Sequence, residues 1–449
     1  MRVNLLNRLA LVALLAACLA SCTGLGPTAT FFKPTSPHDQ YGQSLKEARL
    51  DKTAMGIDWL RAAERAIQDS VTINVPYRES GYFSASKPMA VGYRLRAQRG
   101  DRFLVKVETV GQQRAQVFID VFALDEGSKP VLVAASKADT NVLNWEPRKN
   151  QAYLIRVQPE LLRSGNFTIA ITREPALSFP VQGSTSKQIA SYFGAPREGG
   201  RRRHEGVDIF APRGTPLLAC ADGTISGVGT NRLGGNVAYV VDNDRGIRIY
   251  YAHLDRWNVT NGQRVSRGDT VGFVGNTGNA RTLSPHLHFG IYNNDGTATD
   301  PLPFIRLGRG PARQPLLSPA RLGDSIRVAA ARTSVRKAPA TSGAVVEELP
   351  KQAAMTIMGG TDLWLRVETP GGRIGYVNAE ATEPVGRPVR QLTLTSSRPL
   401  LDQANAMAAP ITTLPAGTTV SLLASYGGFQ LVRAAGQQPG WISAPVLGP

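Results

Sequence analysis

Four of the five histidines of this 449-residue chain lie between residues 204 and 288. They occupy a His-Glu-Gly-Val-Asp motif at 204–208, a His-Leu-His-Phe motif at 286–289, and position 253 between them. Histidine titrates near neutral pH and is a common ligand of transition metals, so packing alone does not explain such a cluster. The fold of this region must bring the four side chains within reach of one another.

The spacing within the two motifs predicts a metal site. The apolar, β-prone residues after His288 indicate a strand, on which His286 and His288 share one face with Cα atoms about 6–7 Å apart. His204 and Asp208 would be about 13 Å apart if fully extended, and Gly206 between them permits a bend. His204, Asp208 and one of the paired histidines would then supply three ligands, with the fourth position left for water as in catalytic zinc sites.

The first motif is not expected to form a zinc-binding helix. His204-Glu205 begins like the His-Glu-x-x-His pattern, but the fifth residue is Asp208. Gly206 and Pro212 also disfavour a helix here. Glu205 is therefore not expected to act as the general base.

At these residues the chain resembles the LytM/lysostaphin-type zinc metallopeptidases, which cut peptide bonds in bacterial peptidoglycan. The resemblance covers roughly residues 185–305. It implies that His204, Asp208 and His288 bind one Zn²⁺ per chain, while His253 and His286 act on the water and the reacting carbonyl. The matching motifs are Phe-Gly at 193–194, Val-Asp-Ile at 207–209, Tyr-Ala-His-Leu at 251–254, Gly-Phe-Val-Gly at 272–275 and His-Leu-His-Phe at 286–289.

One residue and one segment depart from the family's pattern. Gly290 stands where the family often carries Glu, and residues 279–285 differ from its usual short turn. Both departures leave the ligands intact and concern substrate contacts beside them.

The first 21 residues are predicted to be a lipoprotein signal peptide. Two arginines precede an apolar run that is too short to span a bilayer comfortably. The run ends in Leu-Ala-Ser-Cys at 19–22, which resembles a bacterial lipobox in which Cys22 is lipidated. Ordinary cleavage with an incidental Cys22 is the alternative. Acyl chains on Cys22 would anchor the protein to the membrane, and Thr23 and Gly24 resemble an outer-membrane sorting signal, so we expect it on the periplasmic face of that membrane.

Residues 22–70 are predicted to form a tether followed by one or two short helices between about 44 and 69. Ser44 and Glu47 form a capping-box pattern, and His38 is expected to be solvated within the tether. Cys220 is the cysteine left after Cys18 leaves with the signal peptide and Cys22 is lipidated, so no disulfide is possible within the mature chain. We expect Cys220 to be a buried small hydrophobe rather than a zinc ligand.

The rest of the chain is predicted to be mainly β. Short alternating strands with polar turns indicate a β-sandwich that weakly resembles bacterial pre-peptidase domains, for which spacing or scaffolding is the expected role. Two C-terminal segments resemble bacterial SH3-type domains, small β-barrels that either target the wall or pack against the catalytic domain. The expected units are a β-sandwich at 71–175, a linker at 175–180, an antiparallel β peptidase domain at 181–308, a linker at 309–322, and SH3-like domains at 323–386 and 387–449.

The formal net charge of +17 predicts an acidic partner. Anionic wall polymers, lipopolysaccharide and peptide carboxylates fit an envelope protein, whereas nucleic acid does not fit an exported chain. Arg201, Arg202 and Arg203 would either hold substrate carboxylates or form a solvated loop. The hypothesis is a D,D-endopeptidase acting on peptidoglycan cross-links. The alternatives are a catalytically silent regulator that activates wall amidases, with wall hydrolases or envelope proteins as partners, and a wall-binding scaffold.

Overall fold

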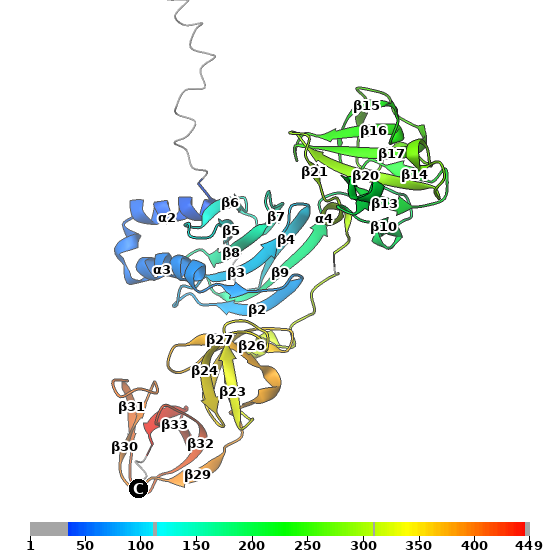
Figure 1. The fold of residues 1–449 in the computed structure, drawn as a ribbon. Helices are drawn as coiled ribbons and strands as arrows, with labels where there is room; N and C mark the ends of the chain where they lie inside the picture. Colours follow the sequence, from blue (N-terminus) through cyan, green and yellow to red (C-terminus); the bar gives the residue numbers. More distant parts are fainter. Residues whose placement is uncertain (1–34, 111–114, 309, 445–449) are drawn as a thin grey trace, which may run out of the picture.

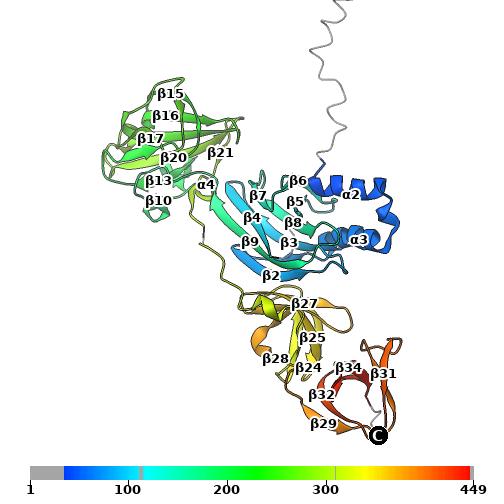
Figure 2. The ribbon, with the colours of Figure 1, turned by 180° about the vertical axis from the view of Figure 1, so that it is seen from behind.

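The computed structural model describes residues 35–110, 115–308 and 310–444. These residues form mainly antiparallel β-sheets, as predicted. A β-sandwich lies in the middle of the molecule, the histidine-rich domain on one side of it and the C-terminal β-domains on the other (Figures 1 and 2). The predicted signal peptide and Cys22 lie outside the described residues. Among the residues described, no helix is long and apolar enough to cross a membrane.

The N-terminal helices cover one face of the sandwich and begin earlier than expected. Helix α2 (Pro37–Glu47) starts inside the predicted tether and is capped by the side chain of Ser36. A short turn, η3 (Leu50–Lys52), leads to α3 (Ala54–Gln68). The helices themselves were predicted, but the capping box was not correct, because the Ser44 hydroxyl donates to the Tyr41 carbonyl within α2.

His38 is buried, which contradicts its predicted exposure. Its ring stacks on Trp59 with centroids 4.7 Å apart. Nε2 donates to Gln158 at 2.7 Å, and Nδ1 accepts from Arg156 at 2.8 Å. The composition of this segment is typical of a tether, although the segment forms a helix. His38 in this helix forms hydrogen bonds with buried polar groups of the sandwich.

The sandwich consists of two packed sheets. One has the strand order β1-β3-β8-β5-β6, and the other contains β2-β9-β4-β7. Alternate side chains point inward, so Val105, Ile155 and Ile169 are completely buried. The strands are β1 (Val71–Thr72), β2 (Tyr77–Phe83), β3 (Val91–Ala97), β4 (Asp101–Val110), β5 (Val117–Leu124), β6 (Val131–Ala135), β7 (Val142–Trp145), β8 (Gln151–Pro159) and β9 (Gly165–Pro175).

The first C-terminal β-domain shares a sheet with the sandwich. Strand β2 pairs antiparallel with β25 (Ala354–Thr361) through Ser80↔Gly360 and Gly81↔Gly359. The sheet order therefore continues as β24-β23-β27-β26-β25-β2-β9-β4-β7. The other strands of this domain are β22 (Ser325–Val328), β23 (Arg332–Arg336), β24 (Val345–Pro350), β26 (Trp364–Glu368), β27 (Ile374–Asn378) and β28 (Thr382–Pro384).

The last β-domain is a six-stranded sheet with the order β29-β32-β33-β34-β30-β31. Its apolar side chains form a core of their own, which includes Val420, Leu422 and Val432. The strands are β29 (Arg390–Thr393), β30 (Arg398–Leu401), β31 (Pro410–Leu414), β32 (Thr419–Tyr426), β33 (Phe429–Ala434) and β34 (Gly440–Ser443).

The histidine-rich domain is built on a ten-stranded sheet whose main order is β10-β13-β20-β17-β16-β15-β18. Cys220 is completely buried behind this sheet, as predicted, and burial raises the pKa of its thiol to about 12. The strands are β10 (Ile189–Ser191), β13 (Val207–Phe210), β14 (Pro216–Leu218), β15 (Gly223–Asn231), β16 (Gly235–Asp242), β17 (Ile247–Trp257), β18 (Arg264–Val265), β19 (Thr270–Val274), β20 (His286–Asn293) and β21 (Ala298–Thr299).

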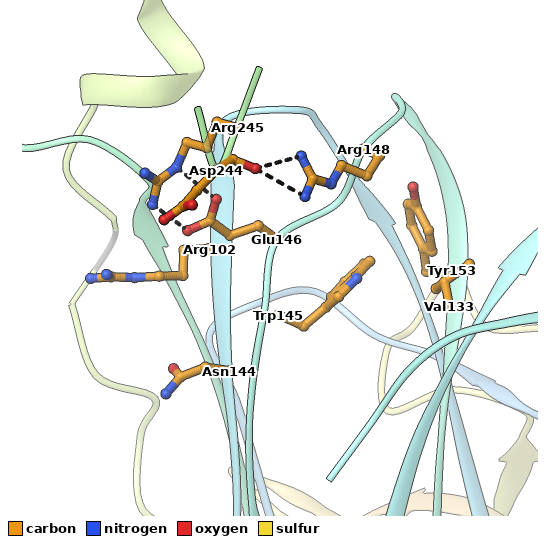
Figure 3. A pocket seen from close by; sticks show the side chains of 9 residues that line it. All are labelled: Arg102, Val133, Asn144, Trp145, Glu146, Arg148, Tyr153, Asp244 and Arg245. Atoms are coloured by element: carbon orange, nitrogen blue, oxygen red, sulfur yellow. Dashed lines mark hydrogen bonds and ion pairs between the residues drawn. The ribbon is translucent and has the colours of Figure 1, made fainter. Parts of the chain in front are cut away.

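The segment predicted as a linker at 175–180 is not a free linker, because Leu177 is buried in the domain core and its N–H donates to the Phe304 carbonyl in α4 (Leu302–Ile305). Several side chains also join this domain to the sandwich. Arg99 donates to Asn293, Arg245 donates to Glu146 at 2.8 and 2.9 Å, and Arg148 donates to the Asp244 carbonyl (Figure 3). A cavity of about 470 Å³ remains between the last two of these contacts.

Candidate metal centre

Strand pairing places the two motifs side by side. In the antiparallel pair β13–β20, Asp208 lies opposite His288 and Phe210 opposite His286. Leu287 and Phe289 point into the core and are completely buried, so His286 and His288 face the other side of the sheet. The structure thus confirms the predicted strand and the prediction that His286 and His288 share one of its faces.

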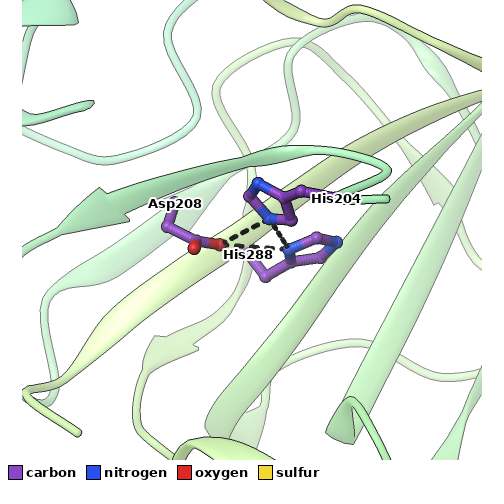
Figure 4. A group of neighbouring side chains, drawn as sticks. All are labelled: His204, Asp208 and His288. Carbon is purple, nitrogen blue, oxygen red and sulfur yellow. Dashed lines mark hydrogen bonds and ion pairs between the residues drawn. The ribbon is translucent and has the colours of Figure 1, made fainter. Parts of the chain in front are cut away.

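The three predicted ligands converge on one point (Figure 4). His204 Nε2 lies 2.9 Å from His288 Nδ1 and 3.1 Å from Asp208 Oδ1, and His288 Nδ1 lies 3.1 Å from the same oxygen. Their side chains are 3%, 13% and 15% exposed for His204, Asp208 and His288. His288, and not His286, is therefore the member of the pair that completes the group.

The chemistry of these atoms fits a cation. His204 Nδ1 lies 3.0 Å from the Tyr192 carbonyl, which can only accept, so its proton sits on Nδ1 and Nε2 presents a lone pair. Burial lowers the pKa of His288, which favours the neutral ring.

The separations are compatible with zinc. Zinc bonds of about 2.0–2.1 Å in a tetrahedron place ligand atoms about 3.3 Å apart, close to the triangle seen here. Two nitrogens and one oxygen leave a fourth position for water, which is the form of a catalytic zinc site.

Gly206 serves the site by leaving space. A Cβ at this position would lie 2.5 Å from the Phe289 carbonyl oxygen and 2.8 Å from Cε1 of His288. The residue was predicted to permit a bend, and the structure adds that no side chain fits at position 206.

His253 reaches the same face through an irregularity in β17. Tyr251 points into the core and is completely buried, so in a regular strand His253 would follow it. Instead His253 has a left-handed φ of 64°, and the pairing of β17 shifts register beside it. Bulges of this kind redirect side chains near active sites. The ring centroids of His253 and His286 are 5.0 Å apart, and that of His253 is 5.9 Å from His288.

Backbone carbonyls orient both of these rings. His253 Nδ1 lies 2.9 Å from the Thr277 carbonyl, and His286 Nδ1 lies 2.8 Å from the Ser284 carbonyl. Each ring therefore carries its proton on Nδ1, and Nε2 is the basic nitrogen. Burial, followed by the effects of His286 and His288, lowers the pKa of His253 to about 4. His253 is thus neutral at pH 7.

Arg197 was not predicted as a site residue. Its Nη2 donates to Asp208 Oδ2 at 2.8 Å. The predicted arginines lie farther along the same segment: Arg202 pairs with Glu198, and Arg203 donates to the Gly194 carbonyl. Sequence offered no signal that separated Arg197 from the arginines that follow it.

Glu205 takes no part in the triangle. Its carboxylate accepts a hydrogen bond from Tyr292 at 3.3 Å, on the exposed side of the domain. This agrees with its exclusion as the general base.

The sequence matches two known families. Residues 202–301 match Peptidase family M23, a family of zinc metallopeptidases. Residues 331–383 match the bacterial SH3 domain. The second SH3-like domain, at 387–449, stays a prediction.

Named relatives match about a quarter of this chain. Glycyl-glycine endopeptidase ALE-1 of Staphylococcus capitis is 44% identical over 107 residues, which are 23% of this chain and 29% of that protein. Peptidoglycan DD-endopeptidase ShyC of Vibrio cholerae is 35% identical over 131 residues, 28% of this chain and 29% of that protein. The chain thus spans less than a third of the length of either relative. Among solved structures, the catalytic domain of lysostaphin from Staphylococcus simulans is 36% identical in sequence to the matched part of this chain. The match covers 26% of this chain and 89% of that domain, with a TM-score of 0.24.

Proposed function

We propose that this chain is a zinc-dependent endopeptidase that hydrolyses peptide cross-links of peptidoglycan, because residues 202–301 match Peptidase family M23. The observation that carries the proposal is the triangle of His204 Nε2, Asp208 Oδ1 and His288 Nδ1, with edges of 2.9 to 3.1 Å. Two ring nitrogens and one carboxylate oxygen that converge in this way form a set of ligands suited to a transition-metal cation.

His204, Asp208 and His288 would hold one zinc ion. When bound, zinc lowers the pKa of a water ligand and polarises the scissile carbonyl. His253 and His286 supply the remaining chemistry from the open side. One of the two rings accepts the proton of the attacking water at Nε2. The other donates to the developing oxyanion when it carries a proton on Nε2 as well as on Nδ1. The Thr277 and Ser284 carbonyls keep both rings in the required orientation.

The proposed bond is the direct cross-link between D-alanine and diaminopimelate. Thr23 and Gly24 after Cys22 resemble an outer-membrane sorting signal, and walls beneath such membranes are usually cross-linked without glycine bridges. The cross-linked stems carry free carboxylates. The exposed Arg201 and Arg203 lie just before the first ligand, where they could attract these anions.

Digestion of defined substrates tests this function. The mature chain with Cys22→Ser is incubated with purified cross-linked muropeptide dimers and, separately, with pentaglycine. Zinc-dependent conversion of dimers to monomers, read by mass, is expected. Cleavage of pentaglycine alone would contradict the proposed bond. Cleavage of neither substrate by zinc-loaded protein would favour the regulator of wall amidases.

The proposed location is the periplasmic face of the outer membrane, anchored through lipidated Cys22. The lipobox-like residues 19–22 support this proposal. Fractionation of cells that express the wild type and Cys22→Ser tests it. We expect the wild type with the membranes and the variant in the soluble periplasm, and a soluble wild type would refute the anchor.

A further inference from the structure

Asp208 uses its two carboxylate oxygens for different tasks. Oδ1 faces His204 and His288 at 3.1 Å each. Oδ2 points away from them and accepts from Nη2 of Arg197 at 2.8 Å. The same Nη2 donates its other hydrogen to Ser191 Oγ at 2.7 Å. The outer oxygen of the predicted ligand is therefore held by an arginine.

The local backbone fixes where Arg197 stands. It lies in β11 (Pro196–Arg197), which pairs with β12 (Arg202–Arg203) to form a short hairpin. The base of the hairpin is tied to the first ligand, because the backbone of His204 exchanges hydrogen bonds with Gly194 and Ala195. Ser191 lies in β10 directly opposite Asp208 in β13. The contact between Arg197 and Asp208 thus joins three separate segments beside the metal position.

Ser191 extends this contact toward a second ligand. Its hydroxyl lies 3.4 Å from His204 Nδ1, whose main partner is the Tyr192 carbonyl at 3.0 Å. The side chain of Arg197 is 32% exposed and that of Asp208 is 13% exposed. The guanidinium therefore sits at the rim of the site, where it can reach Asp208 without occupying the metal position.

We propose that Arg197 is a positioning residue for the metal, an inference that rests on the proposed zinc site. The terminal torsion of an aspartate has broad minima, so a free carboxylate rotates easily. A charge-assisted hydrogen bond on Oδ2 fixes that rotation and keeps Oδ1 in line with the two histidine nitrogens. The Asp208 carboxylate is therefore already oriented before zinc binds, and this preorganisation raises the affinity for the ion.

A role in substrate binding predicts something different. The structure gives Nη2 of Arg197 two partners, and among the described residues it gives none to Nε and Nη1. These two atoms could bind a substrate carboxylate. A residue used only for that purpose would change KM and leave the zinc affinity of the free protein unaltered.

Zinc affinity of the full mature chain is the test. Metal-free wild type, Arg197→Ala, Arg197→Lys and Arg201→Ala are titrated with zinc in competition with a chromophoric chelator. Arg197→Ala is expected to raise the Kd for zinc by about 10- to 100-fold, the usual effect of losing an outer partner of a ligand. Arg197→Lys should recover part of the loss because it retains one charged donor. Arg201→Ala is the matched control, since the hydrogen bond that Arg201 makes within the described part of the chain goes to the Glu198 carbonyl of the hairpin turn.

The outcomes separate this inference from the function on which it rests. A wild type that binds no zinc would refute the proposed function. A wild type that binds zinc, with an Arg197→Ala Kd within about twofold of it, would overturn the positioning role, whether or not KM rises. Thermal unfolding of the metal-free variants controls for damage to the fold. If Arg197→Ala fails to fold, Arg197→Gln takes its place with the same expected weakening.

Discussion

Two largely buried carboxylates of this molecule, Glu79 and Asp208, have opposite surroundings. Glu79 lies at the junction of the sandwich and the SH3 domain and is completely buried. Tyr77, Tyr93 and Tyr376 donate their hydroxyls to it at 2.7, 2.9 and 3.2 Å. Arg366 lies 3.3 Å away and supplies the opposite charge. Each partner of Glu79 brings a hydrogen or a positive charge.

The inner oxygen of Asp208 faces two ring nitrogens, His204 Nε2 and His288 Nδ1, at 3.1 Å each. The proton of His204 is directed at the Tyr192 carbonyl, so the ring presents a lone pair to Oδ1. Asp208 and His288 lie on the face of the sheet that is partly open to solvent. The comparison teaches that burial does not distinguish a structural cluster from a metal centre. The partners do, because donors and an opposite charge surround Glu79, whereas Asp208 Oδ1 converges with two ring nitrogens on a point suited to a cation.

The largest expected effect is the loss of a ligand. His204→Ala or Asp208→Ala should remove zinc, because two remaining ligands cannot complete the site, and turnover should vanish with it. Elemental analysis of the purified variants measures the zinc, and one ion per chain is expected in the wild type. Full zinc in either variant would contradict the ligand assignment.

Removal of His253 should separate catalysis from metal binding. His253→Ala is expected to keep its zinc and to lose about 10²–10⁴-fold in kcat, the usual contribution of a general acid or base. Kinetics on cross-linked dimers together with zinc content measure both. Near-normal turnover would exclude His253 from the mechanism.

Removal of the charge of Glu79 should destabilise the protein without affecting zinc. Glu79→Gln leaves Arg366 buried without its counter-charge, which typically costs about 3–5 kcal/mol of unfolding free energy. Chemical unfolding measures this change, and zinc content should remain that of the wild type. Loss of zinc in a folded Glu79→Gln protein would mean that the two clusters are coupled.

A surface pair at the same junction is the matched control. Lys87 and Glu368 also join the sandwich to the SH3 domain, at 2.8 Å, but Lys87 is 65% exposed. Glu368→Ala should therefore cost only about 0–1 kcal/mol. An effect as large as that of Glu79→Gln would show that burial is not what distinguishes the two pairs.

Acid should weaken the metal-free protein through its histidines. The pKa of His253 is lowered to about 4 in the folded state, against about 6.5 when unfolded. Between these two pH values the unfolded state binds more protons than the folded state, so the unfolding free energy rises with pH. On acidification from about pH 6.5 to about pH 4 the unfolding free energy therefore falls, by at most about 3 kcal/mol for this group. Unfolding curves of metal-free wild type and His253→Ala, recorded over this pH range, measure the change in unfolding free energy. The unfolding free energy of the variant should depend less steeply on pH. The same pH dependence in both proteins would contradict the attribution to His253.

Sequence predicted the part of the site that depends on local periodicity. The alternation of His286, Leu287, His288 and Phe289 places both histidines on one face of a strand, and the structure agrees. The burial of Cys220 follows from its apolar neighbours in the same way. Such features need no knowledge of distant segments.

The features that were missed depend on backbone irregularity or long-range packing. The left-handed φ of His253 arises where β17 changes partners, which no local pattern encodes. Arg197 is one of several arginines in its segment, and its contact with Asp208 depends on how the hairpin folds back. The pairing of β2 with β25 joins residues about 280 positions apart, so neither strand alone predicts it. His38 was misread because its helix begins within a tether-like composition.

The most direct test of the account is to locate the zinc. Crystals of the zinc-loaded protein would be measured on either side of the zinc absorption edge, and the difference map gives the position of the ion. We expect one peak bound by His204 Nε2, Asp208 Oδ1 and His288 Nδ1, with a water in the fourth position and His253 and His286 beside it. A peak elsewhere, or a fourth protein ligand in place of the water, would contradict the claim that this is an open, catalytic zinc site.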